Sequence, residues 1–178
     1  AKALGQKAQQ GLEVKVIYDS VGCFGVASSF FAELMQAGVE VIEYHPIASW
    51  RRGFTLFGRN HRKCLVIDQE VGYIGGLNIG NEYNQEFSGE EAWRDTHCRL
   101  EGPAAGDIAL LFYDSWFHES GMDMLLANPP QSAHLRERKA QPDWSAQQRQ
   151  QVYIIGAVAG QRRSIRKLYQ FALGHART

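Results

Sequence analysis

The sequence lacks several features that define specialised classes of protein. Its 178 residues include three cysteines, an odd number without a paired spacing, which argues against a disulfide framework and fits a reducing compartment. No stretch approaches the roughly 20 uninterrupted apolar residues of a membrane-spanning helix. No signal peptide is visible, although the sequence does not begin with methionine. With 44% hydrophobic and 21% charged residues, the composition is that of a globular domain.

The formal net charge is zero, but the charges are unevenly distributed. Residues 1–133 hold 10 basic and 17 acidic side chains, whereas residues 134–178 hold 9 basic and 2 acidic ones. Residues 45–67 hold five basic side chains and no acidic one. Local positive potential attracts phosphate groups, and solvated surface arginine is the alternative interpretation. The basic cluster at 162–167 is interpreted as a solvated helix face, with a membrane-contacting surface as the alternative.

Hydrophobic periodicity predicts alternating strands and helices, and therefore an α/β fold with helices on a mixed sheet. Strands are predicted at residues 12–18, 39–44, 61–67, 71–77, 94–100 and 152–158. Helices are predicted over the first ten residues, over 27–37, from Gly102 and Pro103 onward, and over 164–175. The two internal helices have predicted buried faces made of Ala27, Phe30, Phe31, Leu34 and Met35, and of Ile108, Leu111, Phe112 and Trp116. Residues 45–60 and 80–92 are predicted to be loops.

The stretch from His61 to Asp68 carries the most informative polar pattern. Residues two apart on a strand point to the same face, so His61 and Lys63 are expected to project together. Asp68 has the other parity and sits at the turn, so we do not expect it to share their site directly. The following strand is expected to pair with this one as a hairpin.

That second strand ends in Gly75, Gly76 and Asn78, which suit a phosphate site. The two glycines have no Cβ and let a ligand approach the backbone, and the amide of Asn78 adds a donor. A neutral imidazole is a nucleophile for phosphorus and would form a covalent phosphohistidine. The ammonium of Lys63 would neutralise non-bridging oxygens in the transition state. Asp95 is the candidate that fixes the imidazole tautomer, by analogy with a triad.

The pattern His-x-Lys-x4-Asp-x6-Gly-Gly-x-Asn resembles the HKD motif of the phospholipase D superfamily. The sequence around this motif resembles bacterial cardiolipin synthases over about residues 1–120. It comprises Tyr18-Asp-Ser-Val-Gly22, Arg59-Asn-His-Arg-Lys63, Gly75-Gly-Leu-Asn-Ile-Gly-Asn-Glu-Tyr83 and Trp93-Arg-Asp-Thr-His97. The resemblance implies a phospholipase D-like mixed sheet flanked by helices, as one half of a two-half enzyme.

The resemblance also implies roles for individual residues. The catalytic motif positions are matched by His61, as nucleophile or general acid, by Lys63, and by Asp68, the last usually a structural partner. Lys63 and Asn78 match phosphate-binding positions, beside Gly75 and Gly76, and Asp95 resembles the acidic residue that orients the histidine. The family uses neither a metal nor an organic cofactor.

These enzymes need two HKD motifs, and this sequence contains one. We therefore expect a fragment: a phospholipase D-like domain over 1–125 without its first strand, a linker over 126–150, and the start of a second half over 151–178. The expected partners are an anionic phospholipid and a second HKD half, in the same full-length chain or in a homodimer. The fragment itself is expected to be soluble and inactive alone, and its parent peripheral on the cytoplasmic face of a bacterial inner membrane.

The predicted function is phosphatidyl transfer of the cardiolipin synthase type through a phosphohistidine. One alternative is a dimeric phosphodiesterase or endonuclease of the same superfamily, although nucleic acid is not the favoured partner. Another is a non-catalytic module that binds lipid or phosphate. A zinc site made of His61, Cys64, His97 and Cys98 is disfavoured, because His61 and Cys64 would face opposite sides of a strand.

Overall fold

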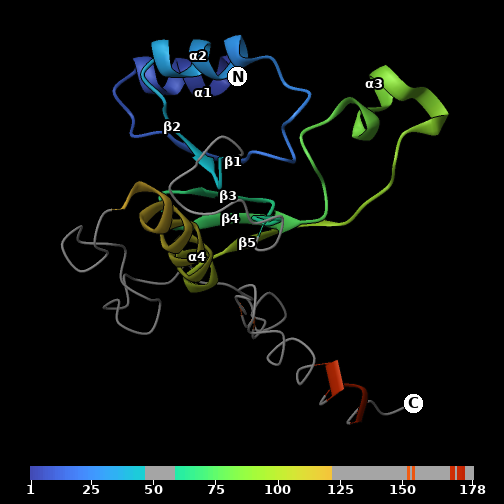
Figure 1. Cartoon of the computed structure of the whole chain (residues 1–178). Coiled ribbons are helices and arrows are strands. Elements are labelled where there is room, and N and C mark those ends of the chain that lie inside the picture. Colours follow the sequence, from blue (N-terminus) through green and yellow to red (C-terminus); the bar gives the residue numbers. More distant parts are fainter. Residues whose placement is uncertain (47–58, 122–151, 153, 155–168, 171, 175–178) are drawn as a thin grey trace. The chain divides into compact units, whose positions relative to one another are not determined.

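The computed structural model describes residues 1–46, 59–121, 152, 154, 169–170 and 172–174 (Figure 1). The chain forms two compact units. The first contains residues 1–61, 115–122 and 157–178, and the second contains residues 62–114 and 123–156. None of the helices in the described part of the chain has both the length and the hydropathy of a membrane span.

The first unit contains a parallel β–α–β arrangement. Its elements are α1 (Lys2–Gln9), β1 (Lys15–Asp19), α2 (Ser28–Gln36) and β2 (Glu40–Tyr44). The two strands pair in parallel from Lys15 opposite Glu40 to Asp19 opposite Tyr44, so a crossover is required and α2 supplies it. Gly38 has a φ of 92°, which lets the chain leave α2 and enter β2.

One face of α2 packs on this sheet. Phe31 and Leu34 are buried, and the ring of Phe31 stacks on that of Tyr18 at 3.8 Å. Phe30 and Met35, which were expected on the same buried face, are 38% and 53% exposed. A helix of nine residues over a two-stranded sheet covers one narrow stripe, so the wider predicted face was partly wrong.

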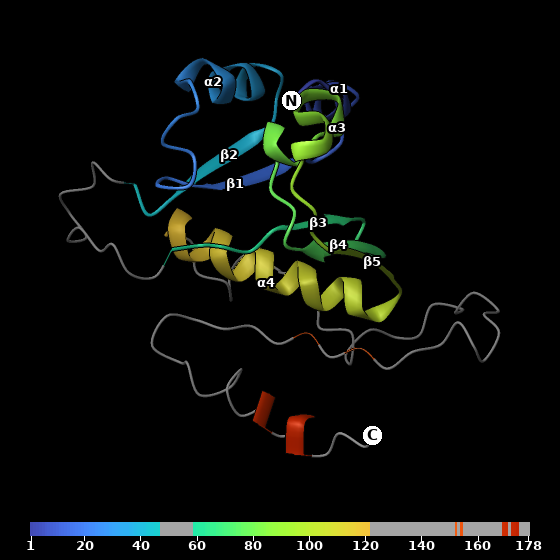
Figure 2. The same ribbon diagram turned by 90° about the vertical axis from the view of Figure 1, so that its right-hand side faces the viewer.

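The second unit contains an antiparallel sheet of order β3-β4-β5 (Figure 2). Its strands are β3 (Cys64–Ile67), β4 (Val71–Gly75) and β5 (His97–Glu101). Between β4 and β5 lie three short helices, η1 (Asn81–Tyr83), α3 (Gln85–Ser88) and η2 (Gly89–Glu91). Residues 80–92 are therefore mainly short helical turns where the sequence predicted a loop. The side chain of Asn84 caps α3 by accepting a hydrogen bond from the N–H of Glu86 at 2.9 Å.

Helix α4 (Pro103–Ser120) begins in the second unit, where it packs against the middle strand. Gly72 of β4 meets Ile108 and Ala105, and a Cβ built at Gly72 would lie 2.7 Å from Ile108 Cδ1. Ile108 is fully buried as a result. The last turns of α4 belong to the first unit, where Trp116 and Phe117 are buried and Lys15 Nζ lies 5.4 Å above the Trp116 ring. Leu111 and Phe112, also predicted to be buried, are half-buried.

The α/β fold class is confirmed, but the strands of the described residues form two separate sheets instead of one mixed sheet. The strand predicted at 61–67 begins only at Cys64, so strand alternation does not govern His61 and Lys63. The predicted linker, most of the loop at 45–60 and most of the strand at 152–158 lie outside the described residues. Of the helix predicted at 164–175, residues 169–170 and 172–174 are described, and they are helical. The division into domains stays a prediction.

Candidate active site

One end of the three-stranded sheet gathers most of the predicted phosphate-site residues. Lys63 immediately precedes β3, and its carbonyl accepts a hydrogen bond from the N–H of Gly75 at 3.3 Å. The N–H of Gly76 donates to the carbonyl of Thr96 at 3.0 Å. Because β3 and β5 both run antiparallel to β4, the start of β3, the end of β4 and the start of β5 meet at this end. Lys63, the glycine pair and Asp95 are therefore neighbours.

Steric crowding explains why Gly75 and Gly76 have no side chain. A Cβ at Gly75 would collide with the carbonyl oxygen of Thr96 and the backbone of His97. A Cβ at Gly76 would collide with both carboxylate oxygens of Asp95. The missing side chains therefore let the Asp95 carboxylate lie directly against the backbone of β4, and close ligand approach stays a prediction.

Lys63 and Asp95 are electrostatically coupled. Partial burial lowers the pKa of Lys63 from its usual value, and the negative charge of Asp95 opposes this shift. Asp95 also accepts a hydrogen bond from the N–H of Thr96 at 2.6 Å, which orients its carboxylate. In the second unit Asp95 thus acts on Lys63, and its predicted role in orienting His61 stays a prediction.

Asn78 and Asp68 lie in different surroundings. Asn78 is exposed, just beyond β4, and its amide donates to the hydroxyl of Tyr83 at 3.3 Å. Asp68 lies in the β3–β4 turn, at the end of the hairpin opposite Lys63, with a positive φ of 51°. Aspartate tolerates this left-handed conformation better than most residues, which suits a turn. Asp68 therefore lies at the opposite end of the hairpin from Lys63 and the glycine pair.

His61 is an exposed residue of the first unit, at the end of a segment that Asp19 anchors. Asp19 accepts hydrogen bonds from Arg59, at 3.1 Å from Nε and 2.9 Å from Nη2, and from the N–H of Asn60 at 2.9 Å. It also accepts from the N–H groups of the following loop at Val21 and Gly22, both at 3.0 Å. The end of β1 therefore fixes the two residues that directly precede His61.

Sequence reasoning did not identify Asp19 as a site residue. The available signal was its place in the segment Tyr18-Asp-Ser-Val-Gly22, which was read only as part of the family resemblance. Its partners Arg59 and Asn60 lie 40 and 41 residues further along the chain. Periodicity within a window carries no information about a contact of that separation.

The surroundings of Asp19 lead to a prediction about how the free energy of unfolding changes at acid pH. Burial works to raise its pKa, but the hydrogen bonds from Arg59, Gly22 and Asn60 together outweigh burial and hold the pKa below its usual value. A carboxylate with a depressed pKa stabilises the fold above its unfolded pKa of about 3.9, and this stability is lost as the pH falls through the folded value. We expect Asp19→Asn to lower the free energy of unfolding at pH 7 and to flatten its decline below about pH 4.

Urea unfolding measured between pH 3 and pH 7 tests this expectation. Glu33→Gln is the matched control, because Glu33 is an exposed carboxylate of α2. A decline as steep in Asp19→Asn as in the wild type would contradict the anchoring role.

The disfavoured zinc site has no support from the second unit. Cys64 and Cys98 pair with Ile74 from its two sides, so a whole strand separates them. Two strand spacings amount to about 9.5 Å, which is too far for ligands of one zinc ion. Burial raises the pKa of the Cys64 thiol, as expected for a structural cysteine.

Comparison with known proteins gives consistent matches. Residues 1–92 match the family described as cardiolipin synthase, PLD-like domain. That range includes every motif residue from His61 to Asn78, and Asp95 lies just beyond it. A cardiolipin synthase of Halalkalibacterium halodurans is 42% identical over 122 residues, which are 68% of this chain and 24% of that protein. A cardiolipin synthase 2 of Bacillus cereus is 41% identical over 120 residues, which are 67% of this chain and 23% of that protein. The chain thus spans about a quarter of the length of these relatives.

Proposed function

The chain belongs to the cardiolipin synthase-type family of phospholipase D-like domains, and from this premise we propose that it supplies one HKD half-site of a phosphatidyltransferase. The observation that carries the proposal is that Lys63, the glycine pair and Asp95 meet at one end of a sheet. Lys63 is also two residues after His61 in the chain. A phosphodiester substrate requires a cation and a nucleophilic or acidic imidazole, which Lys63 and His61 would supply.

The proposed reaction has two displacements. One imidazole attacks phosphorus, so a P–N bond forms as the P–O bond to the leaving alcohol breaks. The histidine of the second half protonates the departing oxygen. A lipid hydroxyl then attacks the phosphohistidine, gives its proton to that second histidine, and restores the free imidazole. His61 takes one of these two roles, and the partner half, in the same full-length chain or a homodimer mate, supplies the other.

The remaining motif residues would hold the phosphate. Lys63 supplies a positive charge at the sheet end, and the exposed amide of Asn78 supplies a donor beyond β4. The N–H groups of Gly75 and Gly76 are already bonded to Lys63 and Thr96, so their proposed contribution is to let Asp95 and the start of β5 lie close to the end of β4. Asp68 lies in the turn at the other end of the hairpin, which supports a structural role. Asp19 positions the segment before His61.

The substrate class follows from the relatives that carry the name cardiolipin synthase. An anionic phospholipid presents its phosphodiester at a membrane surface, so we propose peripheral attachment of the parent protein at the cytoplasmic face of the bacterial inner membrane. The positively charged stretch at 45–67 supports this, because basic segments are attracted to anionic lipid surfaces.

The Asp95→Asn variant distinguishes two possible roles of Asp95, an electrostatic effect on Lys63 and the orientation of His61. Loss of the Asp95 charge removes the field that opposes burial, so the pKa of Lys63 should fall further. Activity that requires the protonated ammonium is lost as the pH rises through that pKa. We therefore expect the alkaline limb of the kcat/KM profile to move to lower pH. A drop in kcat at every pH with an unmoved limb would assign Asp95 to His61 instead.

The test of the proposed function uses the full-length parent protein and phosphatidylglycerol vesicles, with cardiolipin and released glycerol measured by mass spectrometry. Formation of both in equal amounts supports the transferase. Cleavage of DNA without lipid transfer would favour the endonuclease alternative. Vesicle binding without any turnover would favour the non-catalytic module.

A further inference from the structure

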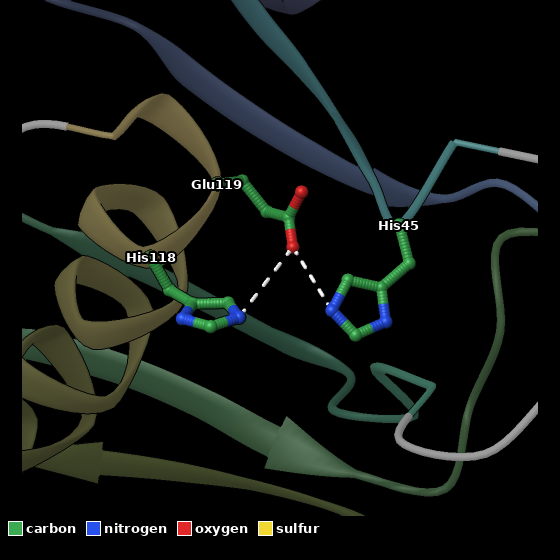
Figure 3. Close-up of side chains that lie close together, drawn as sticks. All are labelled: His45, His118 and Glu119. Carbon is green, nitrogen blue, oxygen red and sulfur yellow. Dashed lines mark ion pairs between the residues drawn. The ribbon is translucent and has the colours of Figure 1, made fainter. Parts of the chain in front are cut away.

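A group of three potential metal ligands lies in the first unit and includes none of the HKD residues (Figure 3). His45 follows β2, and His118 and Glu119 lie in the last turn of α4. The ring of His45 and the carboxylate of Glu119 point toward each other, with His45 Nε2 3.2 Å from Glu119 Oε1. His118 Nε2 lies 3.9 Å from the same oxygen. Among the residues that the structure describes, this is the one group of this kind.

The separations suit a shared ion. Tetrahedral Zn²⁺ holds nitrogen and oxygen ligands at about 2.0–2.2 Å, which places two ligand atoms roughly 3.3–3.6 Å apart. One ligand atom from each of the three residues lies within 4.8 Å of the other two. The His118 side chain is 62% exposed, so its ring has room to turn toward a shared ion.

Burial of Glu119 points to a compensating cation. The Glu119 side chain is only 3% exposed, and a buried carboxylate is costly unless a positive charge accompanies it. A divalent ion bound by both imidazoles and the carboxylate would supply that charge. A protonated imidazole could also supply it, which makes an ion pair without metal the competing explanation.

His45 is held in an unusual backbone conformation that aims its ring at the group. Its φ is 48°, in the left-handed region that few non-glycine residues adopt. Arg59 Nη1 donates to the His45 carbonyl at 3.1 Å, and the Tyr44 ring stacks on the imidazole at 4.4 Å. Strained residues of this kind recur at ligand-binding positions, because the surroundings over-determine their conformation.

We propose that His45, His118 and Glu119 bind a divalent transition-metal ion, Zn²⁺ by ligand type. Two imidazoles and a carboxylate match zinc, whereas a site for Mg²⁺ or Ca²⁺ would be built from oxygen ligands. The ion would join the end of β2 to the end of α4 within the first unit. The proposal does not rest on the transferase activity, and its readout is metal binding.

The experiment strips the full-length protein with a chelator and titrates Zn²⁺ in competition with a chromophoric zinc indicator. We expect one Zn²⁺ per chain and a melting temperature several degrees higher with zinc. His118→Gln should weaken binding by about a hundredfold or more, and because His118 is exposed this variant should still fold. Co²⁺ loading should give the visible absorption of a tetrahedral site.

The matched control is His61→Gln, which removes an exposed imidazole of the first unit that is not one of the three ligands. It should leave zinc affinity unchanged. Failure of the stripped wild type to take up zinc would leave the His45–Glu119 ion pair as the explanation and overturn the proposal. Equal affinity in the wild type and His118→Gln would overturn it too, because the zinc would then be bound elsewhere.

Discussion

Replacement of His61 by alanine in the full-length protein is expected to reduce cardiolipin formation by at least about a thousandfold. The proposed reaction needs this imidazole either as the group that bonds to phosphorus or as the acid that protonates the leaving alcohol. Loss of either function leaves the P–O bond without a route of comparable rate. Folding should be unaffected, since His61 is exposed. The measurement is the initial rate of cardiolipin formation, with circular dichroism to verify the fold.

Trapping of the covalent intermediate separates the two possible roles of His61. Rapid acid-free quenching should trap a phosphatidyl-labelled protein in the wild type, and peptide mapping should locate the label. A label on His61 identifies it as the nucleophile, and a label on the second motif's histidine identifies His61 as the acid. His134→Gln is the control that should retain the wild-type rate. A His61→Ala protein with more than about a tenth of that rate would remove His61 from the mechanism.

Local patterns predicted several elements well. The periodicity of residues 27–37 predicted a helix, and α2 spans Ser28–Gln36 with Gly38 ending it in the left-handed conformation. The hairpin was predicted by two apolar runs around a polar turn, and β3 and β4 pair around Asp68 as expected. These features depend on residues close together in the chain, so a sequence window contains their cause.

The departures come from contacts between distant residues. His61 was predicted to begin a strand, but Asp19 binds Arg59 and Asn60 just before it, and the ladder with β4 begins at Cys64. Gly76 was predicted to let a ligand approach the backbone, and in the structure the Asp95 carboxylate occupies the space beside it. The ring of His45 meets a carboxylate 74 positions later, which no window could contain. Sequence therefore identified the chemical groups of the motif better than their surroundings.

Replacement of Lys63 by methionine is expected to lower kcat/KM by about 100- to 1,000-fold. Methionine keeps much of the side-chain length and removes the positive charge that offsets the developing charge on the phosphoryl oxygens. Vesicle binding should change little, because one charge near the site is a small part of the attraction between protein and membrane. The loss should therefore appear in the rate and not in sedimentation with phosphatidylglycerol vesicles. Lys2→Met, at an exposed lysine of α1, is the matched control.

Lys63→Arg gives the sharper result, because it changes the titration as well as the rate. Burial lowers the pKa of Lys63, so the wild type should lose activity with rising pH earlier than an ordinary lysine would allow. Arginine stays protonated throughout this range, and the alkaline limb of kcat/KM should disappear in the variant even if its rate is reduced by altered geometry. An unchanged limb would assign the alkaline loss to another group.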